Sequence, residues 1–157
     1  MISGESIFST EVSRFQSFKI SLPTVSEAFR EKPVARSYRD LLVWQKAKAL
    51  AVHIYQATEQ FPRNETYGLT SQIRRAAVSV ASNIAEGQGR LTLGEFLHFL
   101  GQARGSLLEL DTQVAIALDL AYLKPDRHEI LDHEIYQVLG LINRLIESLR
   151  KSKASKL

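Results

Sequence analysis

The chain has 157 residues, no cysteine and a formal net charge of +3 at pH 7. This length fits one domain with a substantial core, and the lack of cysteine excludes disulfides and thiolate metal sites. No apolar run approaches the roughly 20 residues that a membrane-spanning helix needs, and the N-terminus lacks the basic start and apolar block of a signal peptide. We therefore expect a cytoplasmic protein, whose mild positive charge permits nucleic acid as a partner without establishing it.

Residues 1–37 differ in composition from the rest of the chain. Phenylalanines are scattered among Ser, Thr, Glu and Lys, and Pro23 and Pro33 interrupt the stretch. Two interpretations of this N-terminal extension stay open. It is either a poorly ordered segment or an arm that docks on the bundle or on a neighbouring subunit.

The first predicted helix covers residues 41–60, with Asp40 as its N-cap. It stops at Phe61, because the residue before a proline disfavours helical dihedral angles. Its apolar residues recur at helical spacing and form one broad arc, which consists of Val43, Trp44, Ala47, Leu50, Ala51, Ile54 and Tyr55.

The second predicted helix runs from a cap at Asn64 to Glu86, and Gly87 and Gly89 are expected to end it in left-handed conformations. Steps of three and four residues place one apolar set on a single face: Leu69, Ile73, Ala76, Val80 and Ile84.

A polar stripe follows the same steps on an adjacent strip of this helix: Gln72, Arg75, Ser79, Asn83 and Glu86. Its small hydroxyl and amide groups are unlike the long charged side chains of a solvated face. We therefore predict that the stripe is partly buried and that neighbouring helices or another subunit satisfy it. Arg75 is expected to pair with a carboxylate, either Glu86 or Glu109.

A third helix begins at Thr92, which forms a capping-box pattern with Glu95, and ends before Pro125. Its long apolar face is flanked by a second apolar strip, made of Leu97, Leu108 and Ala115. This strip is wider than an isolated four-helix bundle needs and indicates subunit contacts. Two glycines one turn apart, Gly101 and Gly105, predict close approach of another helix, since glycine is otherwise unfavourable in a helix.

The fourth helix starts at Pro125 or Asp126. Acidic residues crowd its first half and basic residues its end, a polarity that suits the helix dipole. Four helices with short connections predict an all-α protein, an up-down-up-down antiparallel four-helix bundle over residues 38–151, followed by a basic tail at 152–157.

The histidines do not form a recognisable catalytic or metal site. His128 and His133 are five residues apart and diverge by about 140° on a helix, whereas the zinc-protease motif needs a spacing of four. Glu95 and His98 form a single Glu-x-x-His unit, but di-iron bundles use two. We predict no catalytic residue, no metal site and no cofactor.

Three stretches carry a resemblance to a known family. These are DLLVWQKA at 40–47, FPRNETYGLTSQIRRAAVSVASNIAEGQGR at 61–90 and EFLHFLGQARGSLLEL at 95–110. The chain resembles the small four-helix-bundle proteins encoded in intervening sequences of bacterial large-subunit ribosomal RNA genes. The accessory variability-determinant proteins of diversity-generating retroelements belong to the same group.

The resemblance implies a homopentamer with no known catalytic activity, and in the retroelement branch a basic partner of reverse transcriptase and RNA. It also marks Arg74, Arg75 and Arg90 as family residues. Our candidates for contact with nucleic-acid phosphates are Arg63, Arg74, Arg90, Arg150, Lys151 and Lys153.

Two functional hypotheses follow. The first is a non-enzymatic, oligomeric accessory factor that binds RNA or DNA without strong sequence specificity, since no aromatic-interleaved basic strand suggests base stacking. The alternative is a protein–protein adaptor or structural ring with no nucleic-acid role.

Overall fold

The computed structural model describes residues 37–154. The predicted N-terminal extension, apart from Ser37, and residues 155–157 of the predicted tail lie outside this part. The elements in chain order are η2 (Tyr38–Asp40), α2 (Leu42–Ala57), η3 (Arg63–Glu65), α3 (Leu69–Gln88), α4 (Leu93–Asp119) and α5 (Pro125–Ala154).

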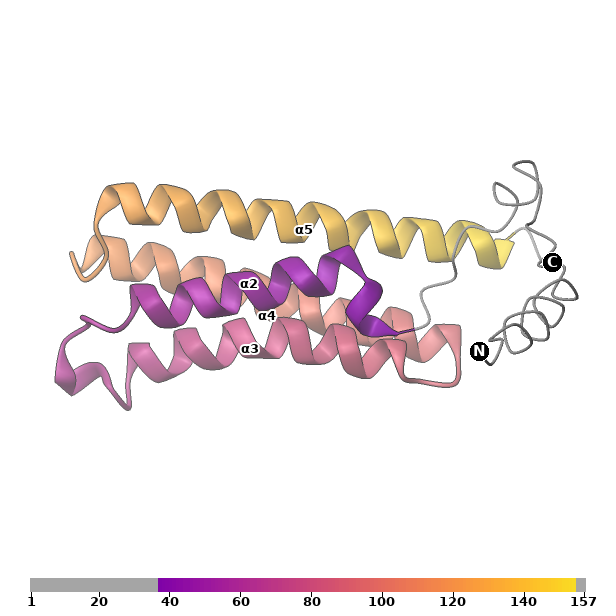
Figure 1. Ribbon diagram of the computed structural model, residues 1–157, viewed down its shortest axis with the longest axis horizontal. Coiled ribbons are helices and arrows are strands. Elements are labelled where there is room, and N and C mark those ends of the chain that lie inside the picture. The colour runs from indigo at the N-terminus through magenta and orange to yellow at the C-terminus, as the bar shows by residue number, and fades with distance from the viewer. Residues whose placement is uncertain (1–36, 155–157) are drawn as a thin grey trace, which may run out of the picture. The chain divides into compact units, whose positions relative to one another are not determined.

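The four α-helices form a bundle, and no strand occurs within residues 37–154. Successive helices run in opposite directions in Figure 1. Helix α3 packs against α2 and α4, and α5 packs against α4 and α2, so each helix contacts two others. The predicted all-α fold is confirmed, and the arrangement agrees with an up-down-up-down bundle.

The core is built from the apolar seams that the helical periodicity predicts. Ile73, Val80 and Ile84 of α3 are fully buried, as are Leu107 of α4 and Ile142 of α5. Most of the second apolar strip of α4 remains at the surface of the protomer, because Leu108 and Ala115 are exposed and Leu97 is half-buried. No helix within residues 37–154 combines the length and apolar character needed to cross a membrane.

The helix starts differ from the predictions. Asp40 is not the N-cap of α2, because its carboxylate accepts a hydrogen bond from the Ser37 backbone N–H at 3.1 Å and so caps η2. Asn64 lies in η3 and does not cap α3. The N-cap residue of α3 is Gly68, and Oε2 of Glu65 accepts the Leu69 N–H at 2.9 Å.

The helix ends also differ. Helix α2 stops at Ala57, and Thr58 closes it by donating its hydroxyl to the Ile54 carbonyl at 2.8 Å. Helix α4 stops at Asp119. The left-handed residue that follows α4 is Ala121, with φ of 56°.

The prediction that Gly87 and Gly89 end α3 in left-handed conformations was wrong. Gly87 lies inside α3 and is buried, and neither Gly87 nor Gly89 has a positive φ. A Cβ atom at Gly87 would lie 2.6 Å from Cβ of Phe99 on α4, so this glycine permits the close approach of two helices. In contrast, a Cβ atom at Gly101 or Gly105 would meet nothing within 4 Å in the protomer.

Candidate nucleic-acid interface

Charge is distributed unevenly along the bundle. The first half of α5, residues 125–138, carries Asp126, Glu129, Asp132 and Glu134 against Arg127 alone, and the second half, residues 139–154, carries four basic residues against Glu147. Because the start of α2, the α3–α4 turn and the end of α5 lie in the same half of the bundle (Figure 1), basic residues from three elements share that half.

We call the following four residues the basic end: Arg39, Arg90, Arg150 and Lys151. Arg150 and Lys151 are exposed and form no ion pair with a described residue. Arg90 differs, because its guanidinium is already hydrogen-bonded to Glu86 and lies 4.7 Å from the centre of the Phe99 ring. Lys153 lies in the last turn of α5, but its side chain is outside the described part. The basic end therefore offers unpaired cations mainly from Arg39, Arg150 and Lys151.

Arg63 and Arg74 lie elsewhere, where α2 ends and α3 begins. Together with Arg75 they line a surface depression of about 490 Å³. The structure thus separates the predicted phosphate contacts into two groups, one near each end of α3. Sequence analysis missed the depression, although three arginines and several hydroxyl side chains within residues 63–75 were a usable signal.

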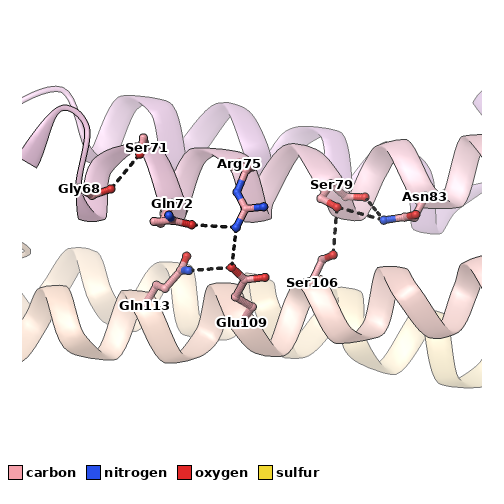
Figure 2. A network of polar contacts seen from close by, with 9 residues as sticks. All are labelled: Gly68, Ser71, Gln72, Arg75, Ser79, Asn83, Ser106, Glu109 and Gln113. Atoms are coloured by element: carbon pink, nitrogen blue, oxygen red, sulfur yellow. Dashed lines mark hydrogen bonds and ion pairs between the residues drawn. The ribbon is translucent and has the colours of Figure 1, made fainter.

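The polar stripe of α3 faces α4 of the same chain (Figure 2). The Ser79 and Ser106 hydroxyl oxygens are 3.0 Å apart, and the Asn83 side-chain amide donates to the Ser79 carbonyl at 2.9 Å. These residues are half-buried, as predicted. Gln72, Arg75 and Glu86 are exposed, so only the middle of the stripe is sheltered by α4. Their long side chains reach the solvent side of the α3–α4 contact.

Arg75 pairs with Glu109, one of the two expected carboxylates. Its Nη2 atom is 3.4 Å from Oε1 of Glu109 and donates to Oε1 of Gln72 at 2.8 Å, as Figure 2 shows. The same Glu109 oxygen accepts a hydrogen bond from Gln113 at 3.0 Å. This network links α3 to α4 at the surface of the bundle.

We predict that the Arg75–Glu109 pair contributes little to stability. Its side chains are 71% and 45% exposed, and such pairs couple by about 0.2–1 kcal/mol. A double-mutant cycle with Arg75→Ala and Glu109→Ala, measured by urea unfolding, should give a coupling energy in this range that shrinks with added salt. A coupling well above 1 kcal/mol would instead place the pair inside an interface that shields it from water.

Three of the four histidines each make a side-chain contact with one other residue. His53 on α2 lies 2.8 Å from the Glu134 carboxylate on α5, His98 lies 2.8 Å from Gln102, and His133 lies 2.8 Å from Gln137. Within residues 37–154 there is no group of three or more His, Cys, Asp or Glu residues placed to hold a metal ion. The His53 contact joins α2 to α5, and the other two lie within one helix each.

The fold and its surface define a helical-bundle protein with exposed arginines and lysines near both ends of α3. The chain belongs to the 23S rRNA-intervening sequence protein family, whose family model matches residues 39–144. A crystal structure of a protein with unknown function from the S23 ribosomal protein family of Bacteroides thetaiotaomicron is similar in fold. It has a TM-score of 0.62 and 19% sequence identity, and the match covers 67% of this chain and 95% of that chain. No match was found among curated proteins.

Proposed function

We propose that this protein is a non-enzymatic, oligomeric helical-bundle protein that binds RNA or DNA through its basic surface residues. It would act as an accessory factor without strong sequence specificity. The observation that supports this most directly is the basic end, where Arg39, Arg150 and Lys151 form no ion pair with a described residue. Phosphate groups are suitable partners for unpaired arginine and lysine side chains on a convex helical surface.

Oligomer formation is proposed from the exposed apolar strip of α4. Within this strip Leu108 is 44% exposed and Ala115 is also exposed, and Gly101 and Gly105 leave room for another backbone beside them. A ring of subunits would repeat the basic end several times, which raises affinity for a long polyanion by multivalency. The homopentamer and the reverse-transcriptase partner implied by the family resemblance remain predictions.

We expect binding to be strongly salt-dependent. If three cations of one basic end each neutralise a phosphate of a single strand, affinity should fall roughly 20-fold between 50 and 200 mM salt, because bound counterions are released. Fluorescence anisotropy with labelled single-stranded RNA and duplex DNA of several sequences measures this directly. Affinity should vary little with sequence. Absence of binding to either nucleic acid at 50 mM salt would remove the proposal.

The second candidate is a protein–protein adaptor or structural ring. The same exposed apolar strip on α4 favours it, because self-association needs no nucleic acid. Light scattering and the anisotropy titration separate the two functions. An oligomer that binds neither nucleic acid supports the adaptor or structural ring. A monomer at every concentration contradicts both functions, since both assume an oligomer.

A further inference from the structure

A second feature of the surface is the depression between the end of α2 and the start of α3. Its volume of about 490 Å³ is in the range of small-molecule sites. Among the described residues that line it are three arginines and one carboxylate, that of Glu59. Arg75 is already paired with Glu109, so Arg63 and Arg74 supply the cationic charge.

Arg74 is held in place before any ligand arrives. Its Nε–H donates to the Thr58 hydroxyl oxygen at 2.8 Å, and Thr58 in turn donates to the Ile54 carbonyl. Its guanidinium carbon lies 4.7 Å from the centre of the Tyr55 ring, a cation–π contact. These two contacts fix the plane of the guanidinium but occupy only Nε. The two terminal nitrogens have no hydrogen-bond partner within residues 37–154, so a preorganised pair of donors remains available.

Two other groups in the depression also lack partners. Arg63 is exposed and its guanidinium makes no ion pair with a described residue. Thr70 is only 7% exposed, and its hydroxyl oxygen has no hydrogen-bond partner within the described part of the chain. Buried hydroxyl groups are normally hydrogen-bonded. Because the Thr70 hydroxyl oxygen is closed off from solvent, the donors that the depression offers to a ligand with several acceptor oxygens are the guanidinium groups of Arg63 and Arg74.

We infer that this depression binds the phosphate group of a nucleotide, held by the guanidinium groups of Arg63 and Arg74. Phosphate presents three or four acceptor oxygens, matches the fork geometry of arginine and carries the charge that two arginines neutralise. This inference goes beyond the proposed function, because the depression lies at the start of α3 whereas the α3–α4 turn of the basic end lies at its other end. The phosphate comes either from a free nucleotide or from a nucleic-acid strand.

The test uses the full-length protein and two ligands, adenosine 5′-monophosphate and a single-stranded RNA octamer, measured by calorimetry. Arg63→Gln should weaken the binding of at least one ligand about 10-fold, the loss of one charge-assisted donor pair. Arg104→Gln is the matched control, since Arg104 is an exposed arginine on α4 that does not line the depression. Arg63 is exposed and unpaired, so Arg63→Gln should melt at the temperature of the unmodified protein.

The outcomes discriminate as follows. Weakened binding of adenosine monophosphate alone identifies a free nucleotide, and weakened binding of the octamer identifies a strand. Both support the site. If Arg63→Gln and Arg104→Gln bind both ligands as the unmodified protein does, the site is refuted, and the proposed function stands or falls separately on Arg150 and Lys151. Thermal protection by adenosine monophosphate, present in the unmodified protein and lost in Arg63→Gln, is a second readout.

Discussion

Gly87→Val is expected to destabilise the protein by about 3 kcal/mol, because overpacking a tight helix contact typically costs a few kcal/mol. The new Cβ would lie 2.6 Å from Phe99 Cβ and 3.0 Å from Cδ2 of Phe96. The first of these atoms is attached directly to the α4 backbone, so α3 and α4 must separate to admit it. Moreover, Val is only a modest helix former, which limits the gain from replacing glycine. The melting temperature should fall by roughly 10 °C at fixed protein concentration.

Gly94→Ala provides the matched control for this variant. Gly94 is exposed in the first turn of α4, and a Cβ atom there would meet nothing within 4 Å. This substitution should leave stability unchanged or raise it by up to about 1 kcal/mol through helix propensity. If Gly87→Val melts at or above the temperature of the unmodified protein, α3 and α4 are not closely packed where Gly87 faces Phe99.

The interior of the bundle was predictable because the buried residues of each helix recur with the helical period. Residues such as Ile73, Val80 and Leu107 recur every three or four positions, and this spacing alone assigns them to a core face. Helix termini were less predictable, since several side chains compete for the same unpaired backbone groups. Asp40 and Asn64 have good capping chemistry, yet Asp40 belongs to the capping box of η2 and Glu65 accepts the first N–H of α3.

For the surface, the sequence shows which residues are charged but not, in most cases, which residues they contact. The sequence identifies Arg75 as a partner for a carboxylate, and Glu109 was one of the two carboxylates named. The sequence does not show that Arg74 donates a hydrogen bond to Thr58, sixteen residues away, or that Gly87 packs against Phe99. Such contacts depend on the relative rotation of two helices, which the spacing within one helix does not determine. For the same reason, candidate phosphate contacts that looked equivalent in the sequence lie in two separate places.

Simultaneous reversal of the two unpaired cations near the end of α5 should impair nucleic-acid binding most. Arg150→Glu with Lys151→Glu removes two proposed phosphate contacts and adds two repulsive charges. At 0.1 M salt each phosphate contact with a single strand is worth about 0.7 log units of affinity through counterion release, so the loss should be on the order of 30-fold before repulsion is counted. The slope of log affinity against log salt should also become shallower by about 1.4.

The matched control reverses the same amount of charge in the other half of the bundle. Lys124→Glu with Arg127→Glu also lowers the net charge from +3 to −1, but Lys124 immediately precedes α5 and Arg127 lies in its first turn, near Asp126 and Glu129. If binding depends on the basic end, this variant should keep its affinity within a few-fold and keep the original salt slope. If both double variants lose affinity equally, the protein responds only to net charge. The basic end then has no special role, and equal retention by both variants leads to the same conclusion.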